Sequence, residues 1–258
     1  MKLTKLTACA LALAGLVACS NSDTASDATQ KGYLSFAVSA ADVVENVTRA
    51  QITLGEATGD YTAPADGDFT IEIIDENDEQ AWSGKLSEWT DTTPLTAGSY
   101  IVKATYDNGR VGFNSPVFSG SATVAVIGGE TSEVDVPVTL QNAVVRLKYT
   151  EMFKNYYSFE KFTITSLDTT VDFTADEARG TFVETTTFKI EGTLTSQAQD
   201  ANGGNPTKTF SKEYVASAAK CYTITFDASN IGGVNGIEIQ FGDEPAETID
   251  LGDIELNE

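Results

Sequence analysis

Apolar and polar residues alternate at every second position along much of the chain from residue 32 onward, which is the pattern of half-buried β-strands. In one such run, Tyr100, Val102 and Ala104 would share one face of a strand. Turn-forming pairs such as Asn108-Gly109 separate the runs. Further apolar positions with this period are Leu34, Phe36, Val38, Ile71, Ile73, Val134, Val136, Val138, Val145, Leu147, Phe188, Ile190, Ile224, Phe226, Ile237 and Ile239. The pattern predicts an all-β protein with two tandem antiparallel β-sandwich domains.

The alternation restarts directly after Gln141-Asn142, and this restart suggests a domain boundary. We expect the first β-sandwich to cover residues 32–142 and the second to cover residues 143–258. No Pro- or Gly-rich linker lies between them, so the domains are expected to meet end to end with restricted motion. Residues 151–158 interrupt the alternation and predict one or two helical turns.

The first residues of the chain have the pattern of an export signal. Two lysines precede an apolar run of about a dozen residues, too short to span a bilayer but long enough for a secretory signal. The run ends in Leu16-Val17-Ala18-Cys19, which resembles the lipobox of bacterial lipoprotein precursors. The resemblance implies cleavage before Cys19 and attachment of diacylglycerol to its sulfur. Residues 1–18 are then a lipoprotein signal peptide, residues 19–31 a lipidated cysteine with a flexible tether, and the location the outer membrane, facing either side. The alternative is an ordinary signal peptide with a chance cysteine.

The charge of the chain limits its partners. Sixteen Lys and Arg residues stand against 38 Asp and Glu residues, giving a formal charge of −22 at pH 7. Removal of two lysines with the signal makes the mature chain still more acidic. Such a surface repels phosphate groups, so we expect neither nucleic acid nor polybasic contact with anionic lipid.

Side chains that often hold metals or act as bases are scarce. The sequence contains no histidine, which is the commonest physiological base and a frequent zinc ligand. Of the three cysteines, Cys9 and Cys19 belong to the signal region, which leaves Cys221 without a disulfide partner and predicts a buried thiol. No cofactor is expected, and no residue can be assigned a catalytic role.

Three stretches resemble known sandwich proteins. Residues 95–104, Leu-Thr-Ala-Gly-Ser-Tyr-Ile-Val-Lys-Ala, resemble the strand entry of prealbumin-like sandwich domains, with Gly98 in the turn and Tyr100 as the first inward side chain. Residues 112–120 and 140–145 more specifically resemble the Bacteroidota lipoproteins of domain-of-unknown-function family forty-four ninety-three. The resemblance implies tandem prealbumin-like or Ig-like β-sandwiches on an outer-membrane lipoprotein. It implies no catalytic residues.

Trp89 is the best candidate for binding a neutral glycan, because an exposed aromatic ring with hydrogen-bonding neighbours suits a sugar. Its neighbours Thr90, Asp91 and Thr92 supply hydroxyl and carboxylate groups. By strand parity Trp82 is expected in the core, whereas Trp89 has the opposite parity and is placed outside it. The alternative is that Trp89 only covers the end of the first sandwich.

Two weaker site candidates lie within the tether and in the first sandwich. Asp75, Asn77 and Glu79 carry oxygen ligands at alternate positions, and calcium prefers oxygen ligands. The run lacks the glycine and the spaced glutamate of an EF-hand loop, so a solvated hairpin turn is the main interpretation. In the tether, Thr24 lies in an Asp-Thr-Ala motif that resembles the O-glycosylation motif of Bacteroidota.

These patterns favour a non-enzymatic, lipid-anchored binding module of the cell envelope. Its partner would be a neutral glycan or another envelope protein. One alternative is a pilin-like structural or adhesive subunit of a surface polymer, in which cleavage at Arg49 would remove the first strand. A less favoured alternative is a glycosidase-like enzyme, because carboxylates are abundant but no particular pair of them stands out.

Overall fold

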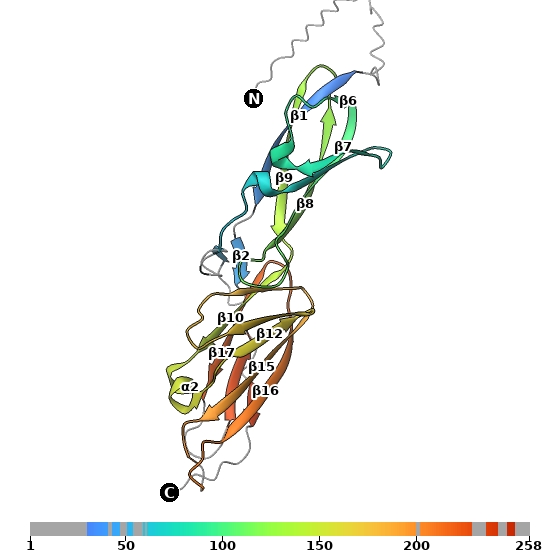
Figure 1. Cartoon of the computed structure of the whole chain (residues 1–258). Coiled ribbons are helices and arrows are strands. Elements are labelled where there is room, and N and C mark those ends of the chain that lie inside the picture. Colours follow the sequence, from blue (N-terminus) through green and yellow to red (C-terminus); the bar gives the residue numbers. More distant parts are fainter. Residues whose placement is uncertain are drawn as a thin grey trace, which may run out of the picture.

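A computed structural model of the chain describes residues 30–40, 43–46, 51–53, 59, 61–199, 202–228, 236–241 and 247–250. The molecule is elongated, with two β-structured halves placed end to end (Figure 1). The prediction of an all-β protein with two tandem β-sandwiches is confirmed. In the described part of the chain, no helix has the length and apolar character needed to cross a membrane.

The first half is one strongly curved sheet of seven strands, in the order β5-β4-β7-β8-β9-β1-β6. The side chains of Tyr100, Val102 and Ala104 are buried in its core, as the alternation predicted. Two short 3-10 turns accompany the strands. The elements are β1 (Lys31–Ala40), η1 (Asp66–Asp68), β4 (Thr70–Asp75), β5 (Gln80–Lys85), η2 (Leu86–Glu88), β6 (Leu95–Thr96), β7 (Gly98–Asp107), β8 (Val117–Val126) and β9 (Thr131–Leu140).

The sheet of the first half turns back on itself at β8. This strand pairs with β7 along its whole length, but only its first residues, Phe118 to Gly120, pair with β9. A Cβ atom on Gly120 would collide with the backbone carbonyl oxygen of Pro137, so the close approach of the two strands requires glycine. By contrast Gly98, which the sequence pattern placed in a turn, has open space around it and no left-handed backbone.

The second half consists of two facing sheets. One has the order β14-β10-β17-β18-β19, and the other has the order β11-β15-β12-β13 with β16 beside β15. The predicted helical turns are confirmed as α2, whose first turn is capped by the Thr150 hydroxyl, which accepts a hydrogen bond from the Phe153 amide at 3.1 Å. The elements are β10 (Ala143–Tyr149), α2 (Glu151–Tyr156), β11 (Tyr157–Ser158), β12 (Phe162–Ser166), β13 (Thr169–Phe173), β14 (Thr181–Val183), β15 (Thr187–Ser196), β16 (Thr207–Val215), β17 (Lys220–Asp227), β18 (Gly236–Phe241) and β19 (Glu247–Asp250).

Among the described strands, pairing is mainly antiparallel, but three pairs are parallel. They join β1 to β9, β10 to β17, and the short strand β2 (Val43–Asn46) to β17. β2 also pairs with β3 (Gln51–Thr53), so a segment that follows β1 in the sequence belongs to a sheet of the second half. The chain therefore enters the second half briefly, at β2 and β3, long before the proposed domain boundary at residue 142.

Each half has its own apolar core. The core of the second half is rich in aromatic rings, among them Phe153, Phe162 and Phe226, which pack between the two sheets. Cys221 on β17 is a buried free thiol, as predicted, and burial raises its pKa to about 11. A thiol with so high a pKa is a packing group rather than a nucleophile.

Candidate binding site at the joint between the halves

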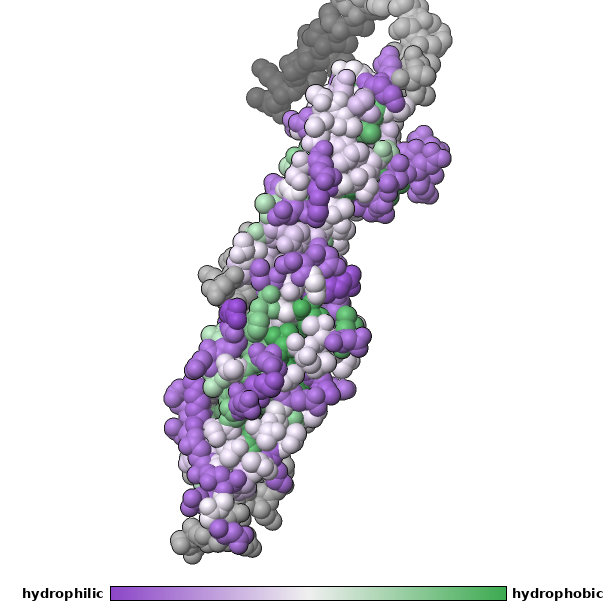
Figure 2. All heavy atoms as spheres, viewed as in Figure 1, coloured by the Kyte–Doolittle hydropathy of each residue, from purple (hydrophilic) through white to green (hydrophobic). Residues whose placement is uncertain are grey.

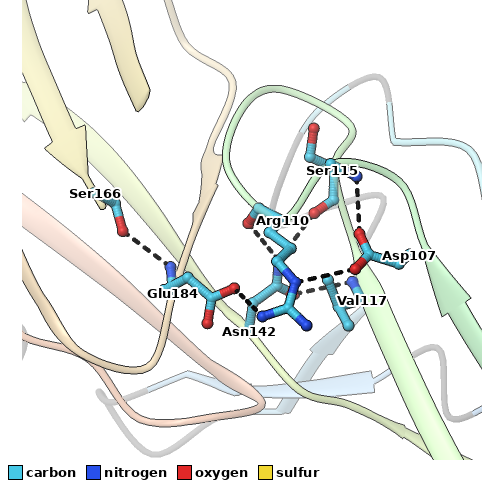
Figure 3. A network of polar contacts seen from close by, with 8 residues as sticks. Asp107, Arg110, Ser115, Val117, Asn142, Ser166 and Glu184 are labelled. Atoms are coloured by element: carbon cyan, nitrogen blue, oxygen red, sulfur yellow. Dashed lines mark hydrogen bonds and ion pairs between the residues drawn. The ribbon is translucent and has the colours of Figure 1, made fainter. Parts of the chain in front are cut away.

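Asn142, directly before β10, is the polar residue that fixes the joint between the halves (Figure 3). Its side chain is only 1% exposed. The amide nitrogen donates hydrogen bonds to the carbonyl oxygens of Arg110 and Ser115, at 2.8 and 2.9 Å. The side-chain oxygen accepts from the Val117 amide at 3.2 Å, and the backbone oxygen accepts from the Ala219 amide at 3.0 Å. A buried amide with its groups paired in this way holds the loop before β8 against the second half.

Backbone hydrogen bonds and apolar contacts connect the two halves across the joint. Gly112 and Phe182 exchange two backbone hydrogen bonds, at 3.1 and 2.9 Å, so the loop of the first half extends the sheet of the second. Val111 belongs to the core of the second half. In return, Phe182, Val144 and Cys221 of the second half belong to the core of the first. These contacts join the two halves at the joint.

An ion pair spans the joint at the surface. The Arg110 guanidinium lies 3.0 Å from the Asp107 carboxylate on β7 and 3.1 Å from the Glu184 carboxylate after β14 (Figure 3). The two carboxylates raise the pKa of Arg110 above its ordinary value. The Arg110 side chain is 55% exposed but that of Glu184 only 15%. The Glu184 amide in turn donates to the hydroxyl of the buried Ser166 at 3.1 Å, which fixes the position of the acidic residue.

The loop that carries Arg110 has an unusual backbone. Arg110 and Asn114 adopt left-handed conformations, with φ of 59° and 56°, alongside Gly109 and Gly112. Left-handed residues other than glycine cost energy and persist only where the surroundings hold them. Asn114 is held by its side-chain oxygen, which accepts from the Thr62 amide at 3.1 Å. The loop is thus fixed from several sides rather than left to adjust.

A groove of about 450 Å³ opens beside this network and is lined from both halves. Its volume lies within the range of roughly 300–1,000 Å³ common for small-molecule sites. Val117, Phe118 and Asn142 are its buried residues. The remaining lining residues are half-buried or exposed and mostly polar: Thr105, Tyr106, Asp107, Arg110, Ser119, Gln141, Glu184 and Thr185.

Trp89 does not lie outside the core, which corrects the expectation drawn from strand parity. Its side chain is 9% exposed, and its indole N–H donates to the Leu34 carbonyl oxygen at 3.1 Å. Phe36 and Trp82 pack against it edge to face, at centroid distances of 5.1 and 5.0 Å. Trp82, expected in the core, is only half-buried. Trp82 still packs against the first core, so the parity prediction is wrong for Trp89 alone. The buried Trp89 ring offers no platform for a sugar.

The neighbours of Trp89 form a turn at the surface. Thr90, Asp91 and Thr92 are exposed. The Thr90 hydroxyl lies 3.0 Å from that of Thr93 and accepts a longer hydrogen bond from Thr92. These hydroxyls satisfy one another within the turn.

The calcium candidate is a tight hairpin turn between β4 and β5. Asp75 accepts hydrogen bonds through one carboxylate oxygen from the amides of Asn77 and Glu79, at 2.8 and 2.9 Å. These bonds hold the pKa of Asp75 below its ordinary value. Figures 1 and 2 show this hairpin projecting from the side of the first half with a hydrophilic surface. Among the described residues, no group of three acidic, histidine or cysteine side chains is placed to hold a metal ion.

Three further candidates, Cys19, Thr24 and Arg49, lie outside the described residues. The sequence patterns did not identify the joint residues Arg110, Glu184 and Asn142 as candidates for a site. The sequence did contain a signal for one of them, because Asn142 lies within the second family-like block. Nothing in the sequence indicates that Glu184, far along the chain, would meet Arg110.

The family model described as a domain of unknown function (DUF4493) matches residues 30–257. The chain belongs to this family. No curated protein matches it.

Several solved structures of Bacteroides proteins are similar to this DUF4493 chain, at low sequence identity. One, from Bacteroides eggerthii and named for cell adhesion, has 10% identity and a TM-score of 0.45, covering 85% of this chain and 96% of its own. Another of that name, from Bacteroides fragilis, has 12% identity and a TM-score of 0.42, covering 84% and 98%. A third, from Bacteroides thetaiotaomicron and named for polysaccharide binding, has 12% identity and a TM-score of 0.39, covering 85% and 98%.

Proposed function

We propose that this DUF4493 protein is a non-enzymatic binding module of the cell envelope, held in the outer membrane by a lipid on Cys19. The observation that supports it most is the joint, where hydrogen bonds, an ion pair and shared apolar contacts hold two sandwiches end to end. Two halves fixed in this way keep the far end of the molecule at a set distance from its anchor. A rod that displays a surface away from a membrane suits binding.

The direction of the chain along this rod fits the proposal. β1 begins in the first half and the last described strands lie in the second (Figure 1). An anchor that precedes β1 would therefore attach to the first half and present the second half outward. The partner is a neutral glycan or another envelope protein, because a formal charge of −22 repels polyanions.

The anchor is tested with the full chain in producing cells. The wild-type protein should enter the detergent phase with the outer membrane. Cys19→Ala should be recovered in the soluble fraction, because several acyl chains at about 0.8 kcal/mol per buried methylene hold a protein almost permanently. Continued detergent partition of the variant would contradict the lipid anchor.

Binding is tested separately from anchoring. Cells that produce the protein should bind immobilised neutral glycans, or the protein should be crosslinked to a second envelope protein, and a deletion strain should lose that signal. A strain without the protein that binds glycans and assembles its envelope as before would contradict the binding role.

A pilin-like subunit is the second candidate, and the placement of β1 favours it. β1 pairs with β9 over the whole of Tyr33 to Ala40 and contributes Leu34 and Val38 to the first core. It also precedes Arg49, so cleavage there would free β1 and leave an edge that another strand could occupy. A ladder in undenatured gels, lost in Arg49→Gln, would support polymerisation. A uniform monomer with an intact N-terminal strand would exclude it.

A further inference from the structure

We propose that the groove across the joint binds a neutral saccharide, with contacts from both halves of the molecule. This inference rests on the proposed binding function and names both its site and its ligand class. The groove is formed by the end of β7, the start of β8, the residues before β10 and the segment after β14. A ligand in the groove would therefore contact residues of the first half and, far along the sequence, Glu184 and Thr185 of the second half.

The groove is built rather than incidental, because its most deeply placed groups are rigid. The buried Asn142 fixes the backbone on one side through its two carbonyl partners, those of Arg110 and Ser115. The Ser166 hydroxyl fixes the Glu184 backbone on the other side. A binding site gains affinity when its groups are already held in place, since less freedom is lost on binding.

The polar groups of the groove suit adjacent sugar hydroxyls. Arg110 lies between Asp107 and Glu184, so a planar donor and two carboxylate acceptors lie next to one another (Figure 3). Carboxylates accept hydroxyl hydrogen bonds more strongly than neutral groups do. Threonine and serine hydroxyls and the Gln141 amide surround this centre. A polyol can donate to the acids and accept from the donors at once.

The groove also has an apolar part. The half-buried Tyr106 lines it, and its ring packs on Phe69 at a centroid distance of 5.6 Å, which fixes the ring orientation. Phe118 lies beneath the groove with no exposed surface, so the aromatic face offered to a ligand is that of Tyr106. Sugar rings carry apolar C–H faces, so an aromatic ring beside hydrogen-bonding groups matches both of their surfaces.

Charge decides between a neutral and an anionic ligand. The single guanidinium in the groove faces two carboxylates, so the centre is negative before a ligand arrives. An anionic group would have to displace one carboxylate from Arg110 and would also meet the negative surface of the whole chain. A neutral saccharide meets neither penalty.

The test uses an array of neutral oligosaccharides and their sulfated counterparts, with the mature chain carrying Cys19→Ala so that it is soluble. The neutral oligosaccharide that binds best is then titrated against variants. Thr185→Trp adds bulk at an exposed position in the groove and should weaken binding by about tenfold or more, a factor that corresponds to about 1.4 kcal/mol. Glu184→Gln keeps the shape but removes the charge and should weaken binding by about tenfold.

Two matched controls locate the site. Thr92→Trp makes the same substitution at an exposed threonine beside the Trp89 turn. Ser99→Trp adds the same bulk in the second groove, of about 410 Å³, which is lined only by residues of the first half. Both should leave affinity for the neutral oligosaccharide within about twofold of the wild type, a change of less than half a kcal/mol.

The outcomes separate the groove from the general binding role. Binding that survives Thr185→Trp and Glu184→Gln, or is lost in Ser99→Trp alone, would overturn the groove and leave the binding module intact. Preference for sulfated oligosaccharides would overturn the ligand class. An array without any neutral binder would overturn the inference, while the binding role would then depend on the crosslinking result. Circular dichroism must show that each variant is folded, and Thr185→Ser provides a conservative variant that should bind like the wild type.

Discussion

Inside the first half, the segment after η2 places an indole ring in the core. At the inner end of this half, which meets the second half, the segment before β8 is fixed by a buried amide. The Trp89 side chain makes mainly apolar contacts with residues of the same half, and its indole N–H donates to the Leu34 carbonyl oxygen. Asn142 makes hydrogen bonds, and its backbone partner Ala219 belongs to the other half. The comparison teaches that Trp89 supports one sandwich and that the inner end supports the connection between two.

The largest expected effect is on the core around Trp89. Trp89→Ala should lower the free energy of unfolding by about 3–5 kcal/mol, because it leaves a cavity in the core and an unpaired Leu34 carbonyl. Urea unfolding monitored by circular dichroism gives the free energy, and hydrogen exchange shows which half opens. The first half should lose protection while the second retains it. Trp82→Ala, which removes a half-buried ring, is the matched control and should cost clearly less.

A smaller but more widely spread effect is expected at the inner end. Asn142→Ala removes one acceptor and two donor contacts in a buried place, which should cost about 2–3 kcal/mol. Because those contacts hold the joint, hydrogen exchange should increase on both sides of it, in residues 108–117 and around Ala219. Gln141→Ala, whose amide donates only to backbone and hydroxyl groups near the surface, is the control. Protection lost in the first half alone would show that Asn142 does not couple the halves.

The ion pair across the joint should matter less than the amide beneath it. Arg110→Gln should lower the melting temperature slightly at low salt and hardly at all at high salt, since exposed ion pairs are screened. Lys103→Gln, which breaks the exposed pair with Glu72 inside a single sheet, is the matched control. If the partly buried Glu184 makes the joint pair stronger, the Arg110 variant should show the larger decrease of the two. Equal decreases would assign the joint pair no special role.

The smallest expected effect concerns the hairpin at Asp75. Its carboxylate pKa lies below the ordinary 3.8 because backbone amides donate to the charged form. A depressed pKa means that this contribution to stability is full above the unfolded pKa and is lost as the pH falls through the folded pKa. A carbon-13 NMR titration of the carboxyl group should give a midpoint below 3.8. Asp75→Asn keeps the acceptor oxygen and should preserve the turn, whereas a normal midpoint in the wild type would contradict the contacts.

The tryptophan pair shows why a correct strand pattern can still place a residue wrongly. Counting every second position from Trp82 assumes one continuous strand as far as Trp89. The strand β5 ends at Lys85, and the 3-10 turn η2 follows it. A 3-10 turn advances the chain with a different period, so the face count restarts after it. Trp89 then faces the core, while Trp82 lies at an edge strand and is only half covered.

The sequence by itself determined which residues form strands, which of their side chains face a core, the helical turns after Thr150 and the burial of Cys221. All of these depend on local periodicity or on the chemistry of one side chain. Only the tertiary structure decided the parallel pairing of β1 with β9, the position of β2 in the second half, and the meeting of Arg110 with Glu184. Alternation states that a strand has a buried face but not which strand lies beside it. Contacts between residues far apart in the chain depend on how the sheets close and stack, and no local pattern encodes that.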